Sequence, residues 1–127
     1  MQIHHTAIVC GSQNVLKEFY NSMFGLTAAD PWERGGGLCG MSLVDEKGSR
    51  IELIESTRIA DAPKEDRDIH TKGVNHVAFL VDNMEEAVER AQSLGGSVHW
   101  PIQQGKTVKQ IAFVRDPEGN LIELLNV

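Results

Sequence analysis

This chain of 127 residues lacks the features that mark several classes of protein. Its two cysteines, Cys10 and Cys39, fit neither a disulfide framework nor the close spacing of a zinc motif, so we expect free thiols in a cytoplasmic protein. Basic residues are outnumbered, and the net charge of −6 argues against nucleic acid or an anionic membrane as a partner. No segment approaches the roughly 18–20 apolar residues of a membrane span, and the first residues show no basic leader region.

What the chain does contain is the composition of an ordinary globular protein, with 41% hydrophobic and 24% charged residues. A chain of this length can bury a core without disulfides or structural metals. We therefore expect a single domain over residues 1–127.

The sequence repeats itself, without a gap, at an offset of 71 residues. Between residues 3–56 and 74–127, ten of 54 paired positions are identical, where chance would give roughly three. The identical residues include a histidine and a glutamate in each half, separated by 47 residues both times: His5 and Glu52, His76 and Glu123. A repeated fold explains repeated glycine, leucine and isoleucine, but it does not explain repeated histidine and glutamate. The repeat therefore predicts two similar modules, each with a functional His–Glu pair.

Both modules predict the same order of elements, a strand, a helix and three further strands. In module 1, residues 1–56, we expect strands near 3–10, 26–29, 38–44 and 49–55, and a helix over 15–24 that Ser12 caps. In module 2, residues 74–127, we expect strands near 74–81, 97–100, 109–114 and 120–125, and a helix between a cap at Asn83 and a stop at Gly95–Gly96. The polar segment 57–73 belongs to neither repeat and is interpreted as a linker or a lid.

The alternation of side chains along a strand places each histidine and each glutamate on an apolar strand face. If the modules pair with pseudo-twofold symmetry, His5, Glu52, His76 and Glu123 converge. An ionised carboxylate among isoleucine and leucine side chains is costly unless it is paired or bound to metal. Two imidazoles and two carboxylates suit one divalent ion per site, either nickel, cobalt, zinc, manganese or iron(II), with positions open for water or substrate.

The alternative for any one of these residues is a structural or solvated side chain, and only their equivalent positions in the repeat favour a metal site. His4, His70 and His99 have no histidine at the equivalent position, so we expect them not to be ligands. His4 is the main rival of His5. The segment Gly35–Gly40 matches GxGxxG but precedes a strand instead of a helix, which argues against nucleotide binding.

We interpret Gly35–Gly40 as a mobile loop near the mouth of the site. Trp32 and Arg34 beside it, and Lys106 in module 2, are weak candidates for contact with substrate. Placement on the surface is the alternative for all three.

Four motifs together resemble the vicinal oxygen chelate superfamily, which includes glyoxalase I, bleomycin-resistance proteins and extradiol dioxygenases. They are His5-Thr6-Ala7, Ile51-Glu52-Leu53, VNHVAF at 74–79 and DPEGNLIEL at 116–124. The resemblance covers the chain outside the linker. It implies an α+β fold in which two tandem βαβββ modules pair into a curled, cup-shaped mixed sheet around the metal, with the helices outside.

The set His–Glu–His–Glu on a short chain is most similar to the compact, often nickel-dependent bacterial glyoxalase I. Extradiol dioxygenases and fosfomycin-resistance enzymes normally have no carboxylate where Glu52 stands, and methylmalonyl-CoA epimerases usually have glutamine there. The resemblance implies a lyase or isomerase that moves a proton between adjacent carbons of a small oxygenated substrate. Glu123 is favoured over Glu52 as the base that moves this proton.

The resemblance also implies a homodimer, and it leaves open whether each cup closes within one chain or across two. Two alternative functions stay open as well. One is an acyl-thioester epimerase or another metal enzyme of the superfamily. The other is a metal-free, resistance-type protein that binds a drug or metabolite.

The sequence departs from glyoxalase I at two positions that help to hold the γ-glutamyl group of glutathione. Glyoxalase I commonly has an arginine four residues after its first ligand and an asparagine four residues after its second, where this chain has Val9 and Ser56. Both face the predicted pocket, as do Ile54 and Leu80. We therefore expect metal chemistry with little use of glutathione.

Overall fold

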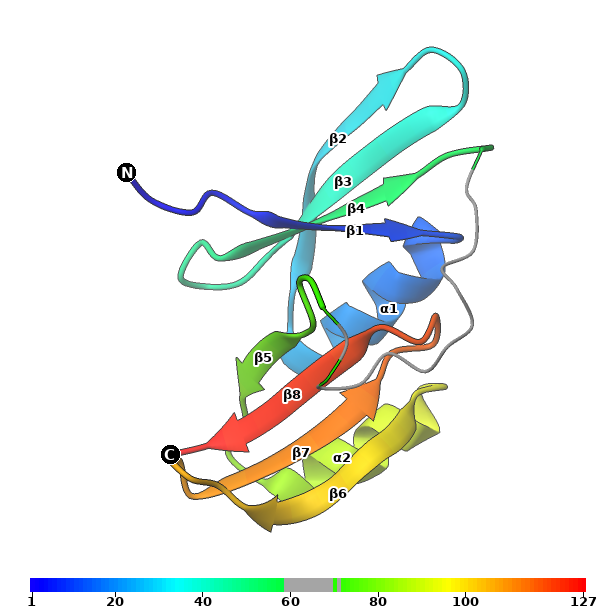
Figure 1. The fold of residues 1–127 in the computed structure, drawn as a ribbon. Coiled ribbons are helices and arrows are strands. Elements are labelled where there is room, and N and C mark those ends of the chain that lie inside the picture. The colour runs from blue at the N-terminus through cyan, green and yellow to red at the C-terminus, as the bar shows by residue number, and fades with distance from the viewer. Residues whose placement is uncertain (59–69, 71) are drawn as a thin grey trace. The chain divides into compact units, whose positions relative to one another are not determined.

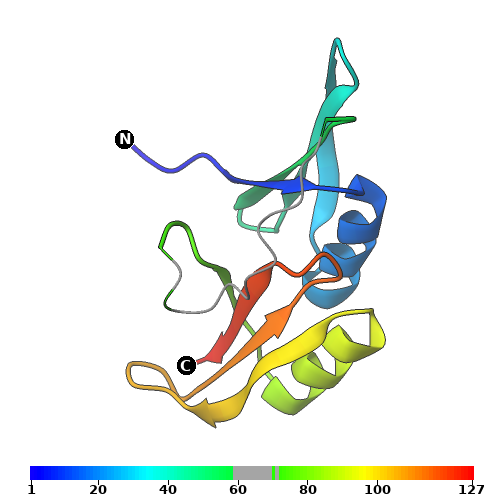
Figure 2. The same ribbon diagram turned by 45° about the vertical axis from the view of Figure 1, so that its right-hand side comes forward.

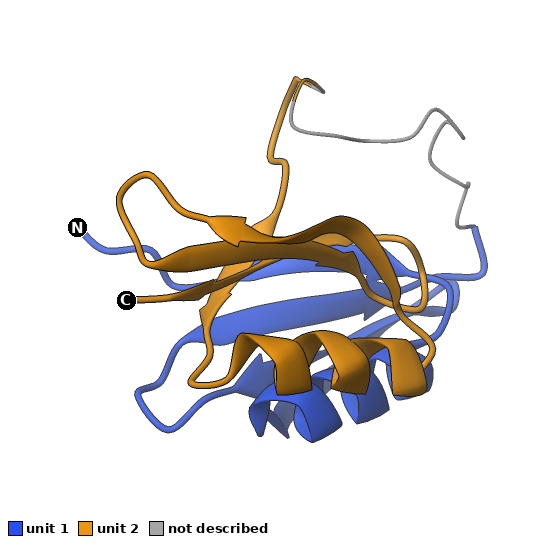
Figure 3. Ribbon diagram, turned by 90° about the horizontal axis from the view of Figure 1, so that it is seen from below, with its two compact units in different colours: residues 1–62 blue, residues 63–127 orange. Residues whose placement is uncertain are grey.

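The computed structural model describes residues 1–58, 70 and 72–127 (Figure 1). Its internal contacts divide the chain into two compact units, residues 1–62 and 63–127, which are coloured separately in Figure 3. Each unit has its own four-stranded sheet and its own helix. In the described part of the chain, neither helix has the length and apolar character that crossing a membrane requires.

Unit 1 contains β1 (Thr6–Cys10), α1 (Gln13–Phe24), β2 (Thr27–Arg34), β3 (Leu38–Val44) and β4 (Arg50–Glu55). The strands lie in the order β1-β4-β3-β2, with β1 parallel to β4 and the other neighbours antiparallel. The Ser12 side chain accepts a hydrogen bond from the Val15 N–H, and Gly25 ends the helix in the left-handed region at φ 71°. This confirms the predicted cap and stop.

Unit 2 repeats this arrangement with β5 (Val77–Leu80), α2 (Met84–Ser93), β6 (Ser97–Gln104), β7 (Gln110–Arg115) and β8 (Leu121–Asn126). Its strands lie in the order β5-β8-β7-β6, again with the first and last strands of the module parallel. The helix α2 contacts this sheet along β6, β7 and β8 (Figure 2). The predicted tandem βαβββ modules are confirmed.

One face of each sheet supplies buried apolar side chains, and the other face carries the glutamate. In unit 1, Ile51 and Leu53 of β4 are buried, whereas Glu52 between them is half-buried. In unit 2, Ile122 and Leu124 of β8 are buried around a half-buried Glu123. Burying an Ile or Leu side chain stabilises a fold by about 1.5–3 kcal/mol. The core therefore fixes the direction in which both glutamates point.

Several predicted boundaries were wrong in a consistent way. The first strand of each module begins at Thr6 or Val77, three residues later than predicted, so His5 and His76 stand immediately before the strands. The strands β2 and β6 extend beyond their predicted ends because each crosses an irregularity in its pairing, which interrupts the side-chain alternation. The predicted loop over Gly35–Gly40 is shorter than expected, because β3 begins at Leu38 and includes Gly40. Only residues 35–37 form the turn.

The predicted linker 57–73 falls mostly on residues 59–69 and 71, which lie outside the described residues. The pairing of the modules in one cup, and their grouping into a single domain over 1–127, stay predictions. Neither cysteine forms a disulfide among the described residues, and Cys10 is buried while Cys39 is half-buried.

Candidate functional site

In unit 1, the parallel pairing of β1 with β4 brings His5 to Glu52. Ala7 lies opposite Glu52 in this register, so the residue two positions earlier reaches the same face. The His5 Nε2 atom lies 3.7 Å from Glu52 Oε1, with 39% and 21% of the two side chains exposed. The pair therefore sits at the surface of the sheet, within reach of a ligand.

In unit 2, the same register brings His76 to Glu123. Ala78 lies opposite Glu123, and His76 Nε2 lies 3.3 Å from Glu123 Oε2. The two side chains are 25% and 19% exposed. Thus each unit by itself brings its repeated histidine and glutamate together.

The residue before each histidine contacts the other ring nitrogen. His4 Nδ1 lies 2.8 Å from His5 Nδ1, and the Asn75 side-chain oxygen lies 2.9 Å from His76 Nδ1. Because an amide oxygen only accepts, the Nδ1–H of His76 donates to Asn75. The Nε2 atom, which lies beside Glu123, is then the ring nitrogen available to an ion. Ligating histidines in metal sites are typically fixed in this way.

The contacts of His4 and Asn75 were not predicted from the sequence, in which His4 is only a rival ligand to His5 and Asn75 only the residue at its equivalent position. A signal was present: the two residues are equivalent in the repeat, and both have side-chain atoms that can hold an imidazole nitrogen.

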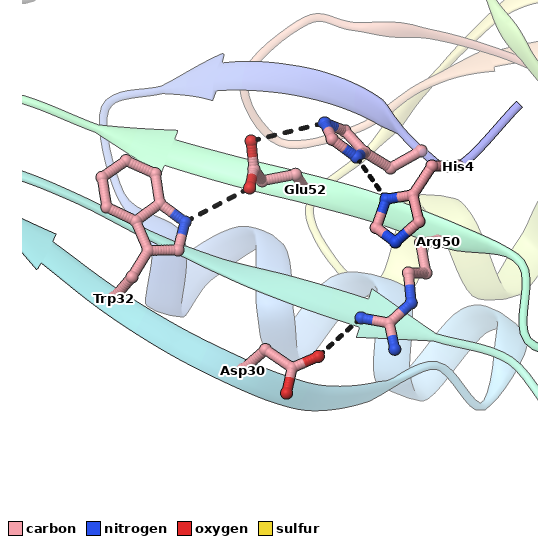
Figure 4. Close-up of polar contacts among 6 residues, drawn as sticks. His4, Asp30, Trp32, Arg50 and Glu52 are labelled. Atoms are coloured by element: carbon pink, nitrogen blue, oxygen red, sulfur yellow. Dashed lines mark hydrogen bonds and ion pairs between the residues drawn. The ribbon is translucent and has the colours of Figure 1, made fainter.

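The two glutamates differ in their other neighbours. The Trp32 indole N–H donates to Glu52 Oε2 at 3.2 Å, as the dashed line in Figure 4 marks. In unit 2, Phe113 lies opposite Glu123 in the β7–β8 register, and its ring makes an edge contact with the His76 ring at 5.1 Å between centroids. Among the described residues, His76 is the polar partner of the Glu123 carboxylate.

The predicted pocket residues fall into three groups. Val9 and Leu80, equivalent in the repeat, are 63% and 67% exposed on the strands that follow the histidines. Ile54, which pairs with Val9, and Ser56 are half-buried. Trp32 is half-buried against Glu52, while Arg34 and Lys106 are exposed and have no side-chain contact with either His–Glu pair among the described residues.

These sequence and structural features match a known family over nearly the whole chain. Residues 2–124 match the Glyoxalase/Bleomycin resistance protein/Dioxygenase superfamily. The chain belongs to this superfamily.

Relatives within the superfamily are similar at modest identity. The chain is 31% identical to a lactoylglutathione lyase of Haemophilus influenzae over 133 residues, covering 98% of this chain and 92% of that protein. It is 26% identical to a lactoylglutathione lyase of Schizosaccharomyces pombe, covering 98% of this chain but spanning 47%, about half, of that longer relative. The crystal structure of a glyoxalase family protein from Bacillus cereus superimposes with a TM-score of 0.85 at 23% identity, over 99% of this chain and 93% of the other.

The spacing of the donor atoms in each unit fits two ligands of one divalent ion. Two ligands bound about 2.1 Å from one ion lie roughly 3.0–3.4 Å apart, depending on the angle between them. The nitrogen–oxygen separations of 3.7 and 3.3 Å are near this range. Among the described residues of this chain, no group of three or more histidine, cysteine or acidic side chains is placed to hold a metal ion. Each unit by itself supplies two candidate ligands.

Proposed function

We propose that this chain is a divalent-metal-dependent, glyoxalase I-like lyase or isomerase. His5, Glu52, His76 and Glu123 would hold one ion of nickel, cobalt, zinc, manganese or iron(II). The observation that carries the proposal is the convergence of a repeated histidine and glutamate to 3.7 Å in one unit and 3.3 Å in the other. The lactoylglutathione lyases among the relatives support the same reaction class.

The proposed site combines both pairs, which requires the two modules to act as one domain, or two copies of the chain to share a cup as a homodimer. Each pair alone supplies two ligands, and a divalent transition ion usually takes at least four. Two pairs therefore complete a ligand set that one unit lacks.

The proposed reaction moves a proton between adjacent carbons of a small substrate that carries oxygen on both. A bound divalent ion supplies Lewis-acid stabilisation of the negative charge that develops on these oxygens. Glu123 takes the proton from one carbon and returns it to its neighbour, as a general base and then a general acid. His5 and His76 hold their Nε2 atoms toward the site, and Glu52 adds a second carboxylate.

The exposed apolar residues Val9 and Leu80 favour a second candidate function, a metal-free protein that binds a drug or metabolite. Large apolar side chains left exposed near a polar pair can form part of a binding surface. The superfamily includes bleomycin resistance proteins, which supports this alternative. An acyl-thioester epimerase is the alternative within the class of metal enzymes.

Metal content separates these proposals. Protein purified without chelator and offered nickel, cobalt, manganese, iron(II) or zinc should hold about one ion per site, measured by elemental analysis. The variant His76→Ala should bind that ion at least about tenfold more weakly, because it loses a ligand. His70→Ala, which removes a histidine outside both pairs, is the matched control. Failure to take up any of the five ions would contradict the enzyme proposal and favour the binding protein.

A further inference from the structure

The carboxylate of Glu52 is held from two sides. Its Oε1 atom faces His5 Nε2 at 3.7 Å, and its Oε2 atom accepts the Trp32 N–H at 3.2 Å (Figure 4). A hydrogen bond to a charged oxygen is stronger than one between neutral groups. The indole therefore engages one carboxylate oxygen and leaves the other toward the histidine.

Trp32 reaches Glu52 because β2 is irregular at this point. The pairing of β2 with β3 shifts between Ala29 and Trp32, and Asp30 within the shift has φ 49°, in the left-handed region. The Asp30 carboxylate accepts from Arg50 of β4 at 2.6 Å, which ties the irregular segment to the strand that carries Glu52. A bulge of this kind redirects a side chain.

Gly40 provides the space that the indole occupies. It lies opposite Trp32 in the β2–β3 register, and a Cβ atom there would come within 2.4–2.6 Å of three Trp32 ring atoms. Real Cβ atoms do not approach so closely, so any larger residue would displace the ring. The bulge, the Asp30–Arg50 ion pair and Gly40 thus all serve the same placement of one side chain.

We propose that Trp32 is a positioning residue that restrains the Glu52 carboxylate as a metal ligand. The inference rests on the proposed function, in which Glu123 moves the proton, and adds to it the group that orients Glu52. A carboxylate with one oxygen engaged by an N–H donor is restrained from turning away from an ion that the other oxygen binds. Glu123 has no indole donor among the described residues, so its carboxylate is freer to leave the ion and take a proton.

The first test measures the contact without metal. The chain has two tryptophans, so a ¹H–¹⁵N spectrum of metal-free protein contains two indole N–H signals, which Trp32→Phe and Trp100→Phe assign. Neutralising the acceptor with Glu52→Gln should move the Trp32 signal, and the matched change Glu123→Gln should leave it in place. A Trp32 signal that does not respond to Glu52→Gln would overturn the proposal.

The second test measures nickel affinity by calorimetry on metal-free protein. Trp32→Phe keeps an aromatic ring over Gly40 but loses the N–H, and it should weaken nickel binding by about tenfold or more, as loss of a group that orients a ligand does. Gly40→Ala should act in the same direction, because its methyl group displaces the indole. Trp100→Phe makes the same change in unit 2 and should bind like wild type.

Equal nickel affinity in wild type and Trp32→Phe, with both folded by circular dichroism, would overturn the positioning role. If the wild-type protein takes up no metal, the proposed function fails, and so does the assignment of a ligand role to Glu52. The indole spectrum then still reports whether Trp32 restrains this carboxylate, so the two failures are distinguishable.

Discussion

The two units of this chain carry the same His–Glu pair on the same pair of parallel strands, yet they surround it differently. In unit 1, an indole N–H and a neighbouring histidine contact the pair; in unit 2, an asparagine and the Phe113 ring do so. The repeat has thus kept the groups that can ligate an ion and varied those that orient them. Two equivalent glutamates can therefore have different roles at a shared metal site. The neighbours of each carboxylate determine how far it is restrained, and only a carboxylate that can leave the ion is free to take a proton.

The largest expected effect concerns the two glutamates. Glu123→Gln should lower kcat by about 10²–10⁴, the usual contribution of a general base, while retaining metal through its amide oxygen. Glu52→Gln should mainly weaken metal binding, and its kcat at saturating metal should fall less. The rates are to be measured on whichever hydroxycarbonyl compound or hemithioacetal the wild type turns over. A Glu123→Gln variant with full metal and wild-type kcat would remove the distinction between the units.

An intermediate effect concerns the equivalent exposed residues Val9 and Leu80. The wild type should turn over the methylglyoxal–glutathione hemithioacetal with a kcat/KM well below about 10⁶ M⁻¹s⁻¹, a value typical of efficient enzymes. Val9→Arg restores the cation that glyoxalase I commonly has in its first module, and it should raise kcat/KM by about tenfold, the scale of one hydrogen bond to a charged group. Leu80→Arg adds the same charge in unit 2 and should give no gain. Efficient wild-type turnover, or an equal gain from both variants, would contradict this interpretation of the pocket.

The smallest expected effect concerns the two aspartates that begin equivalent turns. Asp116 is 3% exposed and accepts from the Glu118 N–H, the Asn120 N–H and the Asn120 side chain. Asp45, half-buried in the other turn, accepts from the backbone N–H groups of Lys47 and Ser49. Asp116→Ala should therefore cost about 2–3 kcal/mol of unfolding free energy, as loss of hydrogen bonds to a charged group does, and Asp45→Ala should cost less.

The loss of unfolding free energy caused by Asp45→Ala should be smaller at acid pH than at pH 7. The Ser49 N–H donates to this carboxylate and is the main cause that lowers the pKa of Asp45 below its ordinary value of 3.8. A lowered pKa in the folded state stabilises the fold above the unfolded-state pKa, and that stabilisation is lost as the pH falls through the folded-state pKa. Urea unfolding at pH 7 and at pH 3 measures the difference between wild type and variant. A cost that grows toward pH 3 would contradict this account.

The sequence by itself determined the order of elements in both units and the face on which each glutamate lies. These follow from local signals: Ser12 and Asn83 cap helices through their own side chains, and buried Ile and Leu on either side of a glutamate force it to the opposite face of a strand. The 71-residue offset also relates the pair His5 and Glu52 to the pair His76 and Glu123, because both residue types recur at equivalent positions.

Only the tertiary structure decided what orients these pairs. Trp32 reaches Glu52 through a register shift against β3 and a space above Gly40, and neither is visible in the periodicity of β2 alone. The contacts of His4 and Asn75 with the following histidines depend on where β1 and β5 begin, which pairing with β4 and β8 sets. Periodicity records which face a side chain takes, whereas bulges and strand ends arise from pairing between segments distant in the chain.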